Sequence, residues 1–182
     1  MLLNIAASPF HLGKEELRHG LIQDRARKHR VPFIFVNQVG ANDELIFDGG
    51  SMALDMEGNP IYIAPYFEEA IKTVEVNHRG SGELFKPTPP LEMLYSALTL
   101  GIKDYLRKCS FQKVVIGLSG GIDSALACCL AVDALGEENV LGISMPSPYS
   151  SVGSVADSRE LADNLGIEFK VVPIDKIFES YL

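Results

Sequence analysis

The stretch Lys113–Leu130, KVVIGLSGGIDSALACCL, constrains the fold of this chain more than any other segment. Its apolar, β-branched residues 114–116 predict a buried strand, and the alanine- and leucine-rich run after Ser124 predicts a helix. Two adjacent glycines, Gly120 and Gly121, lie between them. The stretch therefore predicts a strand that turns sharply into a helix.

The second half of the sequence repeats this alternation of strand and helix. Its predicted elements are a helix over 91–105, the strand and helix of the turn with Gly136 at the helix end, strands over 140–145 and 168–172, and a helix opened by a capping box of Ser154 and Asp157 and closed by Gly166. Strands that alternate with helices predict a parallel sheet covered by helices. This half is therefore expected to be an α/β domain.

The first half contains one helix and several short strands. The predicted elements are a strand over 2–8, a helix over 14–29 and strands over 33–36, 45–47, 51–54, 61–64 and 73–76, with the sequences DGG and DMEGNP as hairpin turns. Glycine, serine and proline concentrate in 77–90, which we expect to be a linker. The predicted domains are 1–76 and 91–182.

Composition limits the kinds of partner. A formal charge of −8 argues against a nucleic acid or an anionic membrane surface as a partner. No apolar run approaches the about 20 residues of a membrane span. The three cysteines, Cys109, Cys128 and Cys129, are too few for a disulfide framework and suggest a reducing compartment, so we expect a cytoplasmic protein.

Three motifs compete for the turn. A Walker loop would need a lysine after Gly121, and the dinucleotide pattern G-x-G-x-x-G is also absent. Residues 117–121 do satisfy G-x-S-x-G, the nucleophile elbow of serine hydrolases, with Ser119 as the nucleophile. That family places its histidine after the serine, whereas all four histidines here precede it: His11, His19, His29 and His78. A serine hydrolase and a non-catalytic adenine nucleotide-binding module remain alternatives.

A phosphate-binding loop accounts for more of the turn. Glycines let backbone N–H groups approach an anion, and the helix that follows adds the positive end of its dipole. Ser119 and Ser124 can donate hydrogen bonds to phosphate oxygens. Asp123 would repel a phosphate unless a cation lay between them, so a bridging magnesium ion is the economical interpretation.

Residues 119–124, SGGIDS, resemble the SGGxDS loop of the ATP pyrophosphatase (PP-loop) family. In that family the loop holds the pyrophosphate end of ATP while a substrate oxygen attacks the α-phosphate, and the end of the next strand, here 143–145, contacts adenine. The ATP-binding residues that the resemblance implies are Gly117, Leu118, Ser119, Gly120, Gly121, Ile122, Asp123, Ser124 and Met145, with Asp123 as a Mg2+ ligand. Residues 145–151, MPSPYSS, further resemble the NAD synthetase branch.

The first half resembles a different part of the same enzymes. Residues 7–14, ASPFHLGK, with 36–40 and 44–51, are similar to the C-terminal part of the nitrilase-type glutaminase domain of glutamine-dependent NAD synthetases. The resemblance implies that Ser8 and Lys14 bind glutamine. It also implies a partial nitrilase-like α/β sandwich followed by a partial parallel-sheet PP-loop domain, of the adenine nucleotide alpha hydrolase-like type.

The implied function is ATP-dependent amidation of nicotinate adenine dinucleotide through an adenylate, with ammonia from glutamine hydrolysis. The catalytic Glu, Lys and Cys of the glutaminase lie upstream of Ser8 in the family, and the dinucleotide-binding residues are expected beyond Leu182. We therefore expect a fragment that is inactive alone and whose parent ligase is a homo-oligomer. The expected cofactors and partners are ATP, Mg2+, nicotinate adenine dinucleotide and glutamine or ammonia.

Overall fold

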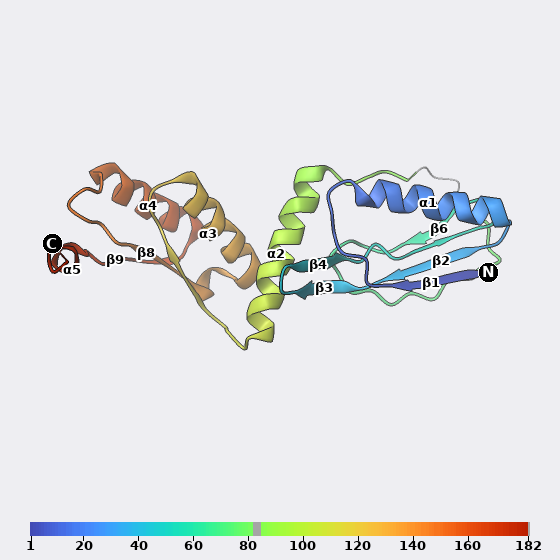
Figure 1. Ribbon diagram of the computed structural model, residues 1–182, viewed down its shortest axis with the longest axis horizontal. Helices are drawn as coiled ribbons and strands as arrows, with labels where there is room; N and C mark the ends of the chain where they lie inside the picture. Colours follow the sequence, from blue (N-terminus) through green and yellow to red (C-terminus); the bar gives the residue numbers. More distant parts are fainter. Residues whose placement is uncertain (82–84, 182) are drawn as a thin grey trace. The chain divides into compact units, whose positions relative to one another are not determined.

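The structure is a computed structural model that describes residues 1–81 and 85–181. The chain divides into two compact units, Met1–Asp104 and Tyr105–Leu182. The first contains β1 (Leu2–Ala6), α1 (Lys14–His29), β2 (Phe33–Asn37), β3 (Val39–Asn42), β4 (Leu45–Asp48), β5 (Met52–Leu54), β6 (Pro60–Ile63) and most of α2 (Pro90–Lys108) (Figure 1). The second contains β7 (Val114–Gly117), α3 (Ile122–Leu135), the 3-10 turn η1 (Glu137–Asn139), β8 (Val140–Ser144), α4 (Val152–Leu165), β9 (Glu168–Val171) and α5 (Asp175–Glu179). The expected mixed α/β architecture with a parallel sheet is confirmed.

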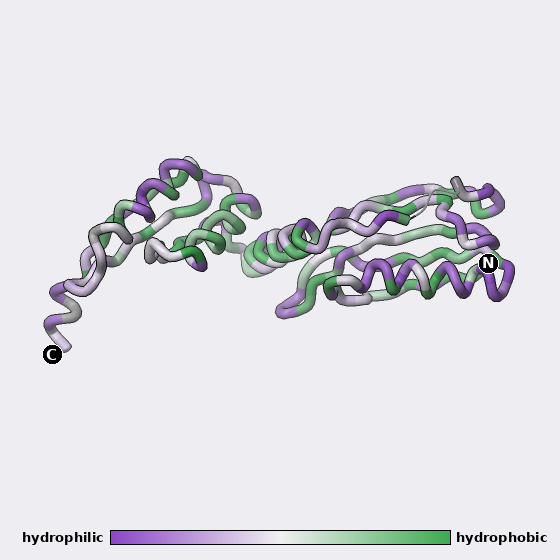
Figure 2. The backbone as a smooth tube through the Cα atoms, turned by 90° about the horizontal axis from the view of Figure 1, so that it is seen from above, coloured by the Kyte–Doolittle hydropathy of each residue, from purple (hydrophilic) through white to green (hydrophobic). Residues whose placement is uncertain are grey.

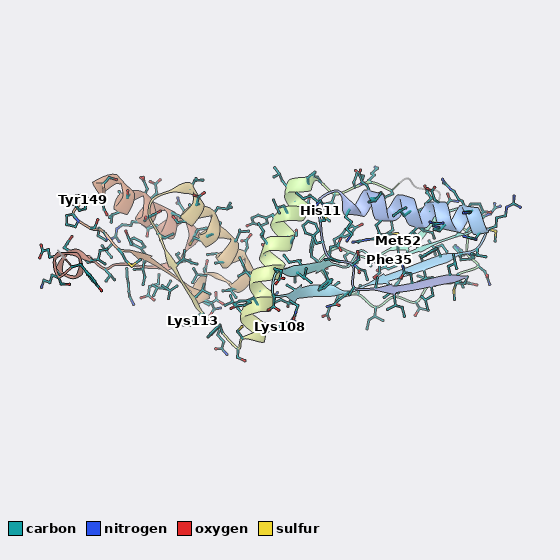
Figure 3. All side chains as sticks on the ribbon, in the orientation of Figure 1. His11, Phe35, Met52, Lys108, Lys113 and Tyr149 are labelled. Carbon is teal, nitrogen blue, oxygen red and sulfur yellow. The ribbon has the colours of Figure 1, made fainter. Side chains whose placement is uncertain are left out.

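The first unit is built on a sheet with strand order β1-β2-β5-β6, covered on one face by α1 (Figure 1). β1 and β2 are parallel, whereas β5 is antiparallel to both of its neighbours. Ile22 and Ala26 of α1 pack on Phe35 and Met52 of the sheet, and Figure 3 labels the latter two between helix and strands. Predicted strands over 2–8, 33–36, 51–54 and 61–64 thus occur, with small shifts at their ends.

Side-chain alternation in β2 positions a polar residue at the edge of this core. Phe33, Phe35 and Asn37 are buried, whereas Val36 is exposed. Successive side chains of a strand point to opposite faces, so Asn37 lies on the face of the two phenylalanines. The helix above them is mostly hydrophilic along its length, in contrast to the apolar strands (Figure 2). A single apolar stripe that includes Ile22 and Ala26 is sufficient to hold it on the sheet.

The DGG sequence does not form the hairpin that its composition predicts. β4 pairs with β3, a strand that sequence periodicity did not reveal, and not with β5. Gly49 and Gly50 both have positive φ, at 66° and 61°, and carry the chain from the two-stranded sheet into the four-stranded one. A Cβ at Gly50 would lie 2.1 Å from the ring of Tyr66. The two glycines therefore make a crossing between sheets, which needs left-handed backbone and space. The DMEGNP turn does join an antiparallel pair, β5 and β6.

The segment after β6 also differs from expectation. The predicted strand over 73–76 is absent, since those described residues belong to no strand. Part of the predicted linker over 77–90 is held on the first unit: Gly80 N–H donates to Asp55 and Thr88 N–H donates to Glu15. Residues 82–84 of that linker lie outside the described residues. The division into domains at 77–90 stays a prediction, and the two compact units divide at Asp104.

The second unit is a parallel sheet of order β7-β8-β9. α3 and α4 pack together against it, and Cys128 and Ala131 of α3 share a core with Ala162 of α4. Right-handed connections between successive parallel strands put both helices on one face, which explains their mutual contact. This sheet and its helices were predicted from the sequence alternation.

The start of α4 corrects one predicted cap. The helix begins at Val152, and Ser151 is its N-cap, because Ser151 Oγ accepts the N–H of Ser154 at 3.1 Å. The predicted capping box of Ser154 and Asp157 is therefore wrong by three residues. Several serines lie near the start of this helix, and the cap that forms is the one whose Oγ reaches the N–H of Ser154.

Candidate functional site

The turn between β7 and α3 is a compact loop stabilised by its own serines. Ser124 Oγ donates to the carbonyl of Gly121 at 2.9 Å and lies 3.1 Å from Ser119 Oγ. It also accepts the N–H of Ser119 at 3.3 Å, and Ser119 Oγ accepts the N–H of Gly121 at the same distance. These contacts within the loop define its shape, and the one between the two hydroxyls is exposed.

Gly120 brings the loop against the first turn of α4. Its φ is 79°, and an added Cβ would lie 2.6 Å from Cα and 2.8 Å from the carbonyl oxygen of Ser154. Both obstacles are backbone atoms, so no rotamer change could relieve them. Glycine is required here twice, for its left-handed conformation and for the close approach of a neighbouring helix.

A pocket of about 290 Å³ opens beside the loop. Gly120, Gly121 and Ser124 line one side, and Asp157 and Ser158 of α4 line the other. Gly121 is the N-cap of α3 and, being glycine, has no side chain that could cap the helix. The first N–H groups of the 14-residue helix α3 therefore begin at the pocket, as in an anion site built from a helix N-terminus.

Of the remaining residues predicted for this site, Leu118 and Ile122 also line the pocket. Asp123 is exposed in the first turn of α3, and Met145 follows β8, with its Cε 3.5 Å from a Cβ built on Gly117. Leu118 is buried below the loop, whereas Ile122 is exposed. Among residues 1–81 and 85–181, no group of three His, Cys, Asp or Glu side chains is arranged to hold a metal ion.

Among residues 1–81 and 85–181, no histidine contacts the Ser119 hydroxyl. This hydroxyl contacts Ser124 Oγ and the N–H of Gly121, and the sequence from Tyr105 onward contains no histidine. Cys128, nearby on α3, is buried, and burial raises the pKa of its thiol. Neither the Ser119 hydroxyl nor the Cys128 thiol is therefore activated as the nucleophile that acyl transfer requires.

Ser8 lies in the loop between β1 and α1 of the first unit, and Lys14 is the first residue of α1. Lys14 Nζ donates to the carbonyl of Pro9 at 2.8 Å. The N–H of Ser8 donates to Asn37 Oδ1 at 2.8 Å. The two predicted glutamine-binding residues, one in the loop and one at the start of α1, therefore both follow the carboxyl end of β1, which is parallel to β2.

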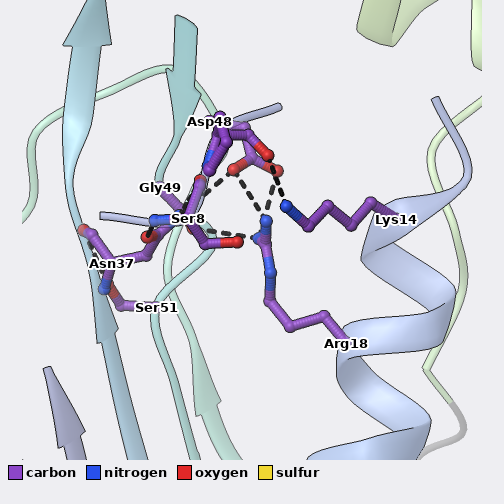
Figure 4. A network of polar contacts seen from close by, with 8 residues as sticks. Ser8, Lys14, Arg18, Asn37, Asp48, Gly49 and Ser51 are labelled. Atoms are coloured by element: carbon purple, nitrogen blue, oxygen red, sulfur yellow. Dashed lines mark hydrogen bonds and ion pairs between the residues drawn. The ribbon is translucent and has the colours of Figure 1, made fainter. Parts of the chain in front are cut away.

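A buried polar network supports that loop (Figure 4). Arg18 of α1 forms a bidentate ion pair with Asp48 of β4, at 3.1 and 3.0 Å, and both side chains are buried. Asn37 Nδ2 donates to Asp48 Oδ1 at 3.1 Å and to the carbonyl of Gly49 at 3.0 Å. A buried carboxylate needs such partners, because an unpaired charge would be strongly destabilising.

Sequence reasoning missed two sets of residues at these sites. Asp157 and Ser158 line the phosphate-loop pocket from α4, which the connection through β8 brings beside α3. Arg18, Asn37 and Asp48 come from three separate elements of the first unit. The alternation of β2, which puts a polar Asn37 in line with two phenylalanines, was the signal that could have pointed to the second set.

Comparison with known proteins gives consistent results for both halves. Residues 94–182 match the family model described as NAD synthase. The chain is 48% identical over its whole length to a glutamine-dependent NAD(+) synthetase of Synechocystis sp. and 40% identical to one of Thermotoga maritima, covering 33% and 38% of those proteins. It thus spans about a third of the length of the relatives that it matches.

Two solved structures match nearly the whole chain. A glutamine-dependent NAD+ synthetase from Acinetobacter baumannii, in complex with adenosine diphosphate, aligns with a TM-score of 0.87 at 32% identity, over all of this chain and 36% of that one. A glutamine-dependent NAD(+) synthetase from Cytophaga hutchinsonii shares the fold with a TM-score of 0.81 at 18% identity, over 98% of this chain and 37% of that one. The resemblance found in the sequence is therefore confirmed: the chain is homologous, from end to end, to one third of the glutamine-dependent NAD(+) synthetases, and its second half matches the NAD synthase family.

Proposed function

We propose that this chain contributes the ATP-binding loop and part of the glutamine-binding surface of a glutamine-dependent NAD(+) synthetase. The reaction would join a carboxylate of nicotinate adenine dinucleotide to AMP, with release of pyrophosphate from ATP. Ammonia from glutamine would then displace AMP and form the amide. The observation that carries the proposal is the loop of residues 119–124, which packs against α4. The chain that contains it is homologous to these enzymes.

The loop suits the polyphosphate of a nucleotide. Backbone N–H groups at Gly121 and at the start of α3 can donate to phosphate oxygens, and the helix dipole favours their negative charge. The Ser119 and Ser124 hydroxyls are exposed and can exchange their mutual contact for contacts with phosphate. The adenosine diphosphate bound by the relative from Acinetobacter baumannii is consistent with this role.

We assign magnesium to Asp123, which is exposed in the first turn of α3. A single carboxylate fits magnesium, which is often held by one or two protein carboxylates together with phosphate oxygens and water. The ion, when bound, would neutralise charge on the phosphates during attack at the α-phosphate. Without it, the Asp123 carboxylate would repel the nucleotide.

We assign glutamine to the loop at Ser8 and Lys14. The hydroxyl and ammonium match the α-amino and α-carboxylate groups of an amino acid. The Lys14 ammonium already donates to Pro9 and has three donors, so it can hold the loop and a carboxylate together. The cysteine nucleophile of the glutaminase would come from outside this chain.

Calorimetric titration of ATP in the full-length protein tests the nucleotide site. Asp123→Asn should weaken binding of Mg-ATP by about 1 to 3 kcal/mol, the range for a charge-assisted contact. With chelator present, the same variant should bind ATP unchanged or slightly better. Asp163→Asn, in the last turn of α4, is the matched control and should behave as wild type in both conditions.

Two results separate the alternatives. If Asp123→Asn weakens ATP binding equally with and without magnesium, Asp123 only stabilises the start of α3 and is not a magnesium ligand. Absence of ATP binding in the wild type would remove the nucleotide proposal as a whole. Gly121→Val should weaken binding in both conditions, because its side chain would occupy the place of a phosphate.

We further propose that the protein acts in the cytoplasm as a homo-oligomer. All three cysteines are free in the structure, which suits a reducing compartment. No helix of the described residues is long and apolar enough to cross a membrane.

A further inference from the structure

Asn37 connects the Ser8 loop to the buried core of the first unit. Its side chain is 6% exposed, at the carboxyl end of β2. Asn37 Oδ1 accepts the N–H of Ser8 at 2.8 Å, and Nδ2 lies 3.3 Å from the carbonyl of the same residue. One amide therefore contacts both backbone polar groups of Ser8 (Figure 4).

The orientation of this amide has one solution. Nδ2 faces three acceptors: the carbonyl of Ser8, Asp48 Oδ1 and the carbonyl of Gly49, at 3.0 to 3.3 Å. A flipped amide would set its oxygen against all three and its NH2 group against the N–H of Ser8. Since an amide has donors on one atom only, the observed orientation is fixed by its neighbours.

The acceptors that fix the amide are themselves held. Asp48 is 1% exposed and is bound on both carboxylate oxygens by Arg18. Arg18 Nη1 also lies 3.4 Å from the carbonyl of Gly49, and its guanidinium lies 5.4 Å from the ring centre of Phe35. The ion pair thus holds the acceptors that orient the Asn37 amide, and this amide in turn holds the backbone of Ser8.

The hydroxyl of Ser8 is left for a ligand. The Asn37 amide contacts its backbone N–H and carbonyl, and no described residue forms a hydrogen bond with Ser8 Oγ. Pro9 follows and has no N–H, and the next backbone anchor of the loop is Phe10, whose N–H donates to the carbonyl of Ile46 at 2.6 Å. We infer that Asn37 is a positioning residue, which acts through Ser8 to place the Ser8 hydroxyl for glutamine.

The inference rests on the proposed glutamine-binding role of Ser8, and the rival is a purely structural asparagine. A positioning role predicts a specific change, because a shift of about 1 Å at a binding group can lower activity up to about a hundredfold. Glutamine-dependent synthesis should suffer, whereas synthesis from free ammonia, which bypasses glutamine, should not. A structural role would lower both in proportion to the unfolded fraction.

The experiment measures NAD synthesis by the full-length enzyme with glutamine or with ammonium. Asn37→Ala should raise the KM for glutamine about tenfold or more, with ammonia-dependent activity within about twofold of wild type. Asn37→Asp should be at least as impaired, since it places an acceptor against Asp48 and Gly49. Asn42→Ala is the control, an exposed asparagine whose amide contacts only the adjacent Asp43, at 3.5 Å, among the described residues.

Ser8→Ala separates failure of the inference from failure of the proposed site. If Ser8→Ala raises the KM for glutamine and Asn37→Ala does not, the positioning role is overturned. Unchanged kinetics in both variants would remove the glutamine site at Ser8 and the inference with it. A parallel loss of both activities in Asn37→Ala would mean a structural role. If Asn37→Ala does not fold, Asn37→Ser carries the same comparison.

Discussion

Gly120 and Ser154 approach each other so closely that the chain leaves no room for a side chain between the phosphate loop and α4. A Cβ on Gly120 would lie 2.6 Å from Cα of Ser154, a distance that real Cβ atoms do not reach. The loop is thus supported from behind by the first turn of α4, in which Ser154 lies 34 positions after Gly120. The shape of the proposed nucleotide site therefore depends on the packing of α4.

Gly120→Ala tests this dependence. The methyl group meets backbone on one side, and alanine disfavours a φ of 79°, so we expect a loss of unfolding free energy of about 2 kcal/mol or more and weaker ATP binding. Urea denaturation and calorimetry measure the two effects. Gly153→Ala is the control: a Cβ there would only reach Ser151 Oγ at 3.8 Å. Wild-type stability in Gly120→Ala would show that the loop and α4 are not tightly packed.

The ion pair of Arg18 and Asp48 should show strong coupling in a double-mutant cycle. Arg18→Met leaves a buried carboxylate without its cation, which should cost about 3 to 5 kcal/mol in urea denaturation. The double variant Arg18→Met/Asp48→Leu removes both charges and should be less unstable than the sum of the single variants. Additive effects would indicate that the two side chains do not depend on each other.

Asp55 should make stability fall in acid. Burial by itself raises the pKa of Asp55, but hydrogen bonds from Asn59, Gly80 and Glu57 outweigh it and hold the pKa below its ordinary value. A lowered folded pKa gives stability that is present above the unfolded value, about 3.9, and is lost as pH falls through the folded value.

Asp55→Asn should therefore cost about 1 to 3 kcal/mol at neutral pH and reduce the loss in acid. Its amide nitrogen would replace one carboxylate oxygen against N–H donors. Denaturation between neutral pH and acid measures both effects, with the exposed Asp24→Asn as the control. If the unfolding free energy of Asp55→Asn falls in acid as much as that of wild type, Asp55 is not the cause of the acid sensitivity.

Glu15 should have the opposite pH dependence. Burial raises the pKa of its carboxyl, although Oε1 accepts the N–H of Thr88 at 2.6 Å. A raised folded pKa means that the folded state binds protons more tightly, so stability rises as pH falls through that pKa toward the unfolded value.

Glu15→Gln should remove this rise and cost little at neutral pH, since its amide oxygen can still accept the N–H of Thr88. Thermal denaturation as a function of pH measures the effect. The neighbouring Glu16 is exposed, and Glu16→Gln should retain the rise. Persistence of the wild-type slope in Glu15→Gln would show that another group causes it.

The sequence predicted most of the local structure because that structure follows from short-range physics. The range of α1 was predicted without error, and the spacing of four residues between Ile22 and Ala26, about one helical turn, puts both on its buried side. The turn at Gly120 and Gly121 was also expected from local sequence, because the apolar pattern of a strand changes there to that of a helix. The residues proposed for ATP are therefore neighbours in the chain, except Met145, which follows β8.

What the sequence could not predict depends on elements that meet only after folding. The absence of a strand over 73–76 and the crossing at Gly49 and Gly50 follow from which strands pair, and local composition does not specify pairing. Equally, the ion pair of Arg18 with Asp48 joins residues 30 positions apart. Local sequence thus determined where the strands, helices and glycine turns could form, whereas the tertiary structure decided which polar side chains became buried together, because burial requires each of them to find its partner on another element.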